Sequence, residues 1–117
     1  LHPSRLGHGV RSIEDPDLVK VIIDKDIILE TCPTSNIATK IYEDYKSHPV
    51  KTLFDQGVKL TVNSDDPPFF NATIQGEYKV MGDLGLNEQE LMSLTHNAIQ
   101  YSFCDEENKN KLLAKLN

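Results

Sequence analysis

Val-Lys-Leu-Thr-Val-Asn-Ser-Asp-Asp-Pro, residues 58–67, contains the clearest strand signal in this chain and its most unusual pair of side chains. Apolar residues at positions 58, 60 and 62 alternate with polar residues at 59, 61 and 63. This period of two predicts a β-strand with one apolar face. Asp65 has the parity of the polar positions, so its carboxylate is expected to point away from the apolar face. Pro67 has no N–H to donate and ends the strand.

The adjacent carboxylates of Asp65 and Asp66 have two interpretations. Like charges at short range repel, so a cation or the hydrogen-bond donors of a ligand would relieve the cost of placing them together at a strand end. Asp-Asp-Pro is also common turn chemistry, which needs no ligand. The pattern itself leaves a binding site and an acidic turn open.

Composition limits the class of protein. The chain has 117 residues, the size of one small domain, with 38% hydrophobic residues. No apolar run approaches the roughly 20 residues of a membrane span, and no signal peptide is recognised. A formal charge of −6 disfavours nucleic acid as a partner. Cys32 and Cys104 are too few for a disulfide framework, which favours a reduced, cytoplasmic compartment.

Strands and helices are expected to alternate along the chain. Strand signals lie at 5–10, 27–32 and 58–64, and residues 33–47 have no clear period and are expected to be a functional loop. Helices are predicted at 13–24, from 48 to 57, at 73–81, at 88–103 and after 105. Asp15 is expected to cap the first of these, and Asn87 with Glu90 resembles a capping box. The apolar stripe of the first helix is expected to consist of Leu18, Val19, Ile22 and Ile23. Strands separated by helices predict a parallel sheet.

Such a sheet would be incomplete. Three parallel strands with helices on one side leave bare edges and an uncovered face, whereas parallel sheets are normally buried on both faces. The face with Thr61, Asn63 and Asp65 becomes polar towards its carboxyl end, as the inner layer of a (β/α)8 barrel does beneath its active site. We therefore predict an α/β chain whose residues 1–117 form one incomplete domain, the C-terminal part of a (β/α)8 barrel of about 250 residues.

His8 is the first candidate catalytic residue. It lies between Gly7 and Gly9 at the end of a strand signal, where glycines allow a ligand or a neighbouring backbone to approach closely. Gly-His-Gly alone also fits a buried structural histidine. If both strand ends belong to one barrel, however, His8 would converge with Asp65 and Asp66, which favours a site.

The other candidates have ordinary explanations. His48 precedes Pro49 and is expected to be a capping or surface residue, and His96 is expected to be structural. His2 has no indicated role. Cys32 is expected to behave as a small apolar residue. Ser35 and Asn36 follow another strand and fit either local turn bonding or support of the site.

Four motifs together resemble the adenosine/adenine deaminase family of the amidohydrolase superfamily. They are Leu-Gly-His-Gly-Val at 6–10, Leu-Glu-Thr-Cys-Pro-Thr-Ser-Asn at 29–36, His-Pro-Val at 48–50 and Val-Asn-Ser-Asp-Asp-Pro at 62–67. They occur in the family's order and at compatible spacing, over essentially the whole chain. The match covers about the C-terminal third of a family member.

The resemblance implies roles for three residues. Asp65 corresponds to the aspartate ligand of a catalytic Zn2+, Asp66 to the carboxylate that bonds the purine ring, and His8 to the histidine that orients the nucleophile activated by the metal. The family's His-x-His pair, and its third histidine ligand with a glutamate three residues later, do not occur in this sequence. We therefore expect the isolated chain to bind zinc weakly and to be inactive, unlike its parent protein.

The substrate implied is a purine nucleoside or nucleobase. Residues 69–73 with Glu77 and Tyr78 resemble adenosine deaminases more than the adenine-specific branch. The resemblance thus favours hydrolysis of adenosine or deoxyadenosine to inosine or deoxyinosine and ammonia. Adenine and other 6-aminopurine derivatives are alternatives. An alternative from another class is a non-catalytic α/β binding module that retains these motifs as relics.

Overall fold

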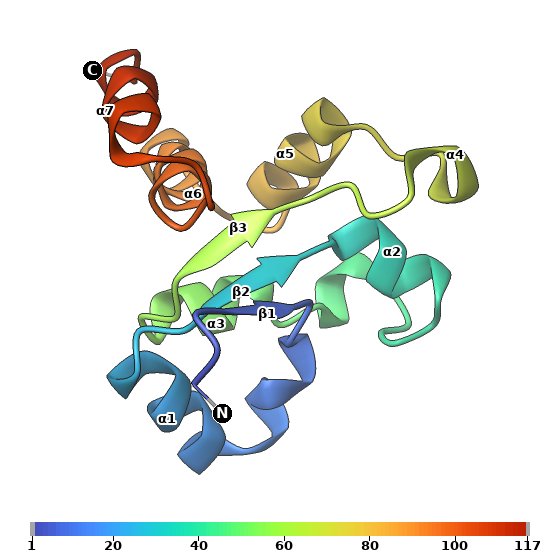
Figure 1. Cartoon of the computed structure of the whole chain (residues 1–117). Helices are drawn as coiled ribbons and strands as arrows, with labels where there is room; N and C mark the ends of the chain where they lie inside the picture. The colour runs from blue at the N-terminus through green and yellow to red at the C-terminus, as the bar shows by residue number, and fades with distance from the viewer. Residues whose placement is uncertain (1, 117) are drawn as a thin grey trace.

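Three short parallel strands lie at the centre of the computed structural model, which describes residues 2–116. They are β1 (Arg5–Gly7), β2 (Ile28–Thr31) and β3 (Leu60–Val62), in the order β1-β2-β3. Leu6 pairs with Leu29, and Leu29 pairs with Leu60. All three strands therefore have their carboxyl ends at the same end of the sheet, where α2 and α4 lie (Figure 1). The predicted parallel sheet is confirmed.

Helices follow every strand. Their bounds are η1 (Val10–Glu14), α1 (Pro16–Asp24), α2 (Pro33–Ala38), η2 (Tyr45–Ser47), α3 (Val50–Asp55), α4 (Pro67–Phe70), α5 (Ile74–Asp83), α6 (Glu88–Gln100) and α7 (Glu106–Ala114). Both predicted caps are confirmed. The side chain of Asp15 accepts hydrogen bonds from the first turn of α1, and Asn87 and Glu90 form the capping box of α6.

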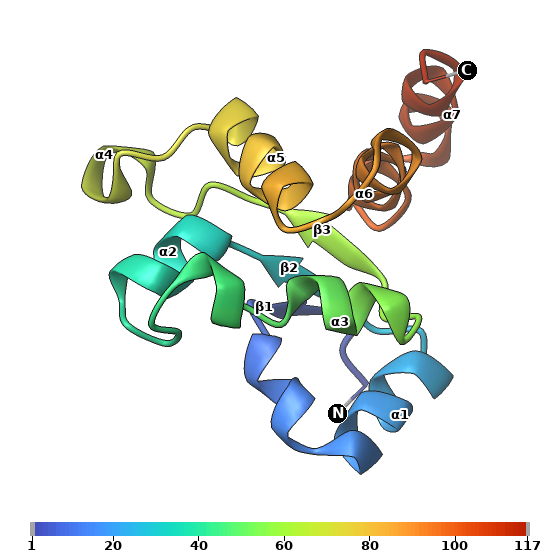
Figure 2. The same cartoon turned by 180° about the vertical axis from the view of Figure 1, so that it is seen from behind.

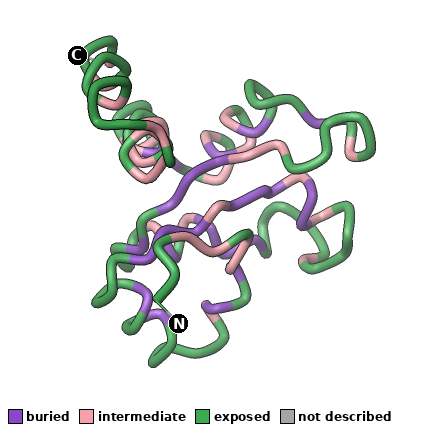
Figure 3. The backbone as a smooth tube through the Cα atoms, in the orientation of Figure 1, coloured by how far each residue is buried: buried purple, intermediate pink, exposed green. Residues whose placement is uncertain are grey.

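The hydrophobic core lies between one face of the sheet and α1, α3, α5 and α6, which cover that face in Figure 2. Its buried residues are Val19, Ile22, Ile27, Leu29, Val50, Leu53, Val58, Leu60, Val62, Met81, Leu86 and Leu94. The alternating residues 58, 60 and 62 all belong to this core, as their period predicts. Burial is concentrated in the strands, whereas α7 is largely exposed (Figure 3).

The other face of the sheet carries polar groups and no helix lies across it in Figure 1. Arg5 and Glu30 form an ion pair of 2.5 Å there, and Asn63 Nδ2 donates to Thr61 Oγ1 at 2.9 Å. Within residues 2–116, β1 and β3 each pair with a strand on one side only. The segment after α6 covers part of this face, since Arg5 donates to the carbonyl of Tyr101 at 3.3 Å and lies 4.3 Å from the Phe103 ring. The absence of a helix layer here in the described part of the chain and the two unpaired strand edges agree with the expectation of an incomplete barrel.

Two sequence-based expectations are wrong in detail. Residues 33–47, expected to form a loop, contain α2 and η2. Leu18 and Ile23, expected in the apolar stripe of the first helix, are 44% and 38% exposed, because the core reaches only the side of α1 that carries Val19 and Ile22. No helix among residues 2–116 is both long and apolar enough to cross a membrane.

Candidate active site

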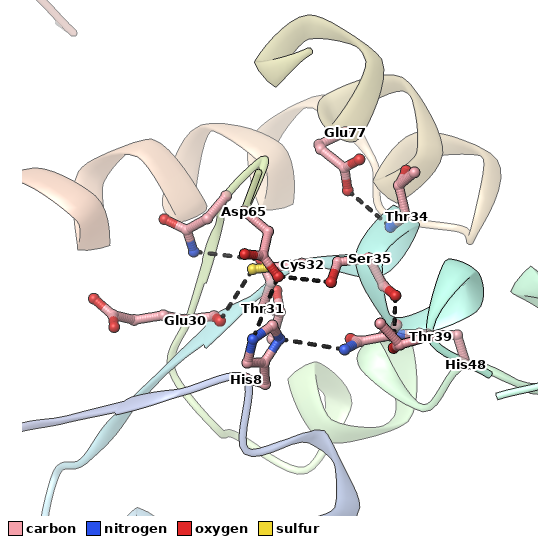
Figure 4. Close-up of polar contacts among 12 residues, drawn as sticks. His8, Glu30, Thr31, Cys32, Thr34, Ser35, Thr39, His48, Asp65 and Glu77 are labelled. Carbon is pink, nitrogen blue, oxygen red and sulfur yellow. Dashed lines mark hydrogen bonds and ion pairs between the residues drawn. The ribbon is translucent and has the colours of Figure 1, made fainter. Parts of the chain in front are cut away.

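The predicted convergence of His8 with the aspartate pair is present. His8 directly follows β1, its backbone N–H donates to the carbonyl of Glu30 at 2.9 Å, and Asp65 lies just beyond β3. The two side chains face each other across the end of β2, with His8 Nε2 3.5 Å from Asp65 Oδ2 (Figure 4). The carboxyl ends of all three parallel strands thus contribute to one site.

Both residues have left-handed backbone conformations, with φ of 55° at His8 and 59° at Asp65. Few residues other than glycine adopt this region, although histidine and aspartate are enriched there. Backbone strain of this kind costs on the order of 1–3 kcal/mol per residue and clusters at functional sites. Gly9 is also left-handed, and a Cβ there would lie 2.7 Å from Leu29 Cδ2. The strand therefore ends in a turn of two left-handed residues, His8 and Gly9, in which glycine is favoured at position 9.

Ser35 orients the carboxylate of Asp65. Its hydroxyl, which belongs to a buried residue of α2, donates to Asp65 Oδ2 at 2.6 Å. The Asp65 side chain remains 33% exposed, so its oxygens are accessible from the open side. Of the two interpretations left open for Ser35, the structure agrees with support of the site.

The Asp66 carboxylate both caps a short helix and lines a cavity. Its Oδ1 accepts the backbone N–H of Phe69 at 3.3 Å and caps the short helix α4, which is the turn chemistry that Asp-Asp-Pro predicts. Asp66 also lines a cavity of about 830 Å³ together with His8, Ser35 and Asp65. Among residues 2–116, its Oδ2 has no hydrogen-bond partner. The turn thus leaves one carboxylate oxygen available to a ligand in the cavity.

The side chains here suit a divalent metal only in part. Ligand atoms of His8, Cys32 and Asp65 all lie within 4.8 Å of one another. Burial, with the nearby carboxylates of Asp65, Glu77 and Glu30, raises the pKa of the Cys32 thiol to about 12. Without a metal ion the thiol is therefore protonated, and its Sγ donates to the carbonyl of Glu30 at 3.7 Å. Asp65 remains the clearest single ligand, which is too few for a complete zinc site.

His48 differs from expectation. It was predicted as a capping or surface residue. It does accept the backbone N–H of Val50, at Nδ1 and 3.3 Å, but it is only 5% exposed. Its Nε2 lies 3.0 Å from Asn36 Oδ1, and Asn36 Nδ2 lies 3.2 Å from His8 Nδ1. Burial lowers the pKa of His48 to about 4. His96, by contrast, is exposed on α6.

Glu77, which the sequence analysis names only for substrate preference, has a structural role beside the site that the sequence did not predict. It belongs to α5, is 1% exposed, and its Oε2 accepts the backbone N–H of Thr34 at 3.1 Å (Figure 4). Cys32 at the N-cap of α2 makes no side-chain capping bond, so Glu77 provides the cap from another helix. A glutamate in an amphipathic helix normally indicates the solvent side, and no local pattern distinguishes this one.

Comparisons with known proteins agree with this arrangement. A sequence model of the adenosine deaminase family matches residues 1–117. An adenine deaminase from Rhizobium leguminosarum bv. trifolii (strain WSM2304) is 46% identical over 117 residues, which cover 99% of this chain and 36% of that protein. The chain therefore spans about 36% of the length of the curated relatives it matches.

Solved structures share the fold. An adenine deaminase from Arthrobacter aurescens matches with a TM-score of 0.93 and 30% identity over 99% of this chain and 36% of that one. An amidohydrolase from Burkholderia ambifaria, solved with bound Zn, matches with a TM-score of 0.84 over 97% of this chain and 32% of that one, and its 22% identity supports the fold alone. The expected α/β segment of a (β/α)8 barrel is confirmed.

Proposed function

Because the chain belongs to the adenosine deaminase family, we propose that the complete protein hydrolyses the 6-amino group of a purine and releases ammonia. Residues 1–117 would form the C-terminal third of its barrel domain. The observation that carries the proposal is the meeting of His8 with Asp65 and Asp66 at the carboxyl ends of parallel strands, where (β/α)8 enzymes place their active sites.

Asp65 would hold a catalytic Zn2+ through its carboxylate, which the Ser35 hydroxyl keeps in one orientation. A bound zinc ion supplies Lewis acidity and lowers the pKa of its water towards neutrality. The remaining ligands and the glutamate acid/base would come from other parts of the complete protein, since the 117-residue sequence contains no His-x-His or His-x-x-Glu. The partial fit of the ligand set is what a segment of such a site should show.

His8 and Asp66 would act on the reactants. The His8 ring lies beside the proposed metal ligand, where it can orient the attacking water by a hydrogen bond. Asp66 lines the same cavity, and its Oδ2, which has no hydrogen-bond partner within residues 2–116, can accept a hydrogen from a purine ring nitrogen or share it. The substrate ring would then be held with its amino-bearing carbon towards Asp65 and His8.

We propose adenine as the favoured substrate. This reverses the preference for adenosine drawn from residues 69–78, because eight curated relatives with 42–47% identity are all named adenine deaminase. No specific observation favours the alternative of a non-catalytic binding module.

The test uses the complete protein, loaded with Zn2+, and measures ammonia release from adenine and from adenosine. We expect kcat/KM to be higher for adenine. Asp65→Asn should lower it by at least about 100-fold, because removing a ligand disturbs the metal and its water. Asp24→Asn, an exposed position at the end of α1, is the matched control and should leave it unchanged. Equal or faster turnover of adenosine would defeat the preference for adenine, and no release from any 6-aminopurine would defeat the deaminase proposal.

The 117-residue chain alone should behave differently. With one strong ligand candidate and no glutamate acid/base, it should bind Zn2+ more weakly than micromolar and release no ammonia. Isothermal titration measures the first property and an ammonia assay the second. Micromolar binding or measurable turnover by the pure chain would show that residues 1–117 contain a more complete site than proposed.

A further inference from the structure

A chain of polar side chains runs from the start of α3 to the candidate site. It connects His48 to Asn36 at 3.0 Å and Asn36 to His8 at 3.2 Å. We propose that His48 is a positioning residue which, through the Asn36 amide, fixes the proton of the neutral His8 ring on Nε2 and directs that N–H towards Asp65.

The donor-to-acceptor direction of these hydrogen bonds is set at their buried end, next to α3. The backbone N–H of Val50 can only donate, and it points at His48 Nδ1 at 3.3 Å. His48 Nδ1 must therefore accept. Because burial keeps the His48 ring neutral above its pKa of about 4, its single ring proton is on Nε2. His48 Nε2–H then donates to Asn36, and only the carbonyl oxygen of that amide can accept it.

The Asn36 amide transmits this direction. With Oδ1 turned to His48, Nδ2 is the atom that faces His8 Nδ1. An amide nitrogen donates and cannot accept, so His8 Nδ1 is the acceptor. A neutral His8 ring must then carry its proton on Nε2, which lies 3.5 Å from Asp65 Oδ2. Asn36 is only 3% exposed, so water is not in a position to compete for its amide.

The packing around His48 keeps this direction from reversing. The Tyr42 ring lies 5.1 Å from the His48 ring at an angle of 59°, and the Tyr42 hydroxyl donates to the carbonyl of Val10 at 3.2 Å. A flip of the Asn36 amide would place its NH2 against His48 Nε2–H, two donors facing each other in a buried setting. Such unsatisfied buried donors are costly. The backbone N–H of Val50 in α3 thereby specifies which His8 nitrogen carries the proton.

The consequence for chemistry rests on the proposed function. In the neutral state His8 would present a hydrogen-bond donor, not a lone pair, to an oxygen bound beside Asp65. It would therefore orient that oxygen. The tautomer of His8 is a property of the chain itself and can be measured without turnover.

The experiment uses the complete protein with 15N-labelled histidine, and reads the His8 tautomer from its ring nitrogen shifts at alkaline pH, where a free imidazole is neutral. The wild type should show the Nε2–H form. His48→Phe should reduce the ratio of Nε2–H to Nδ1–H by about 3- to 10-fold, the worth of one lost hydrogen bond. His48→Gln, whose side-chain NH2 can still donate to Asn36, should restore the ratio. His96→Phe, at an exposed position, is the control and should change nothing.

A second variant, Asn36→Asp, should shift the His8 tautomer from the Nε2–H form to the Nδ1–H form. The carboxylate of Asn36→Asp accepts from both imidazoles, so His8 should change to the Nδ1–H form. This variant decides the matter even if His48→Phe does not fold. An Nδ1–H form in the wild type, or an unchanged tautomer in Asn36→Asp, would overturn the proposal.

Turnover separates this proposal from the proposed function. His48→Phe should lower kcat by about 10- to 100-fold with little change in KM, as loss of an outer hydrogen-bond partner commonly does, and His48→Gln should recover most of it. The expected tautomers without ammonia release from any 6-aminopurine would support the positioning role and defeat the deaminase proposal. Ammonia release with a kcat that is insensitive to His48→Phe would defeat the positioning role alone.

Discussion

Replacing Glu77 with alanine should destabilise the protein and lower the activity of the candidate site. Glu77 makes no hydrogen bond to His8 or Asp65, so both effects would act through α2. The Glu77 carboxyl is 1% exposed and caps α2 through the N–H of Thr34 at 3.1 Å. Glu77→Ala leaves that N–H without a partner, which costs about 1–3 kcal/mol. Loss of one buried CH2 adds about 0.8 kcal/mol. The free energy of unfolding should therefore fall by about 2–4 kcal/mol.

Urea unfolding of the complete protein measures this change. Glu77→Gln keeps an acceptor for Thr34 and should remain within about 1 kcal/mol of the wild type. Glu43→Ala makes the same deletion at an exposed position and should lie within about 0.5 kcal/mol. Because α2 carries Ser35, Glu77→Ala should also lower kcat/KM. Equal stability of Glu77→Ala and the wild type would refute the capping argument.

Three further outcomes follow from the structure. The folded state holds the pKa of His48 near 4, below its ordinary 6.5, so the unfolded chain binds this proton first as the pH falls. The free energy of unfolding should therefore drop by up to about 3 kcal/mol between about pH 6.5 and pH 4. Urea unfolding at several pH values measures this drop, and His48→Gln should make the free energy of unfolding less dependent on pH. Ser35→Ala removes the 2.6 Å hydrogen bond to Asp65 and should weaken Zn2+ binding by about 10- to 100-fold in a titration of the complete protein. Leu94→Ala, fully buried in the core, should cost about 2–5 kcal/mol in unfolding experiments, whereas Met92→Ala, 49% exposed on the same helix, should cost under about 1 kcal/mol.

Local patterns predicted most of the fold. The alternation at 58–63 placed β3 and its apolar face, and Asp15 and Asn87 marked the starts of α1 and α6. These signals are short-range, because a strand's two faces and a helix cap are set by a few neighbouring residues. Residues 33–38 carry only the weaker signal of Pro33 at the first helical position, since the cap of α2 comes from Glu77, far along the chain.

The candidate site was predictable to the extent that it lies at strand ends. His8 and Asp65 could be expected to meet because parallel strands bring their carboxyl ends to one edge. The path through Asn36 and His48 could not be predicted, because it depends on side-chain rotamers and on the position of α3. The sequence His48-Pro49 before a helix suggests a capping role for one ring nitrogen of His48. The partner of its other nitrogen, Asn36, is identified only by the structure.

The free edges of β1 and β3 have a practical consequence. Each offers backbone groups to which another strand can add, although on β3 the side chain of Asn97 already donates to the Leu60 carbonyl at 2.9 Å. Produced by itself, the chain is a candidate for self-association through these edges. Supplied with a separately expressed polypeptide that carries the other strands of the proposed barrel, the same edges would become the interface between the two pieces of the proposed enzyme, and recovered activity would report on whatever brings the pieces together.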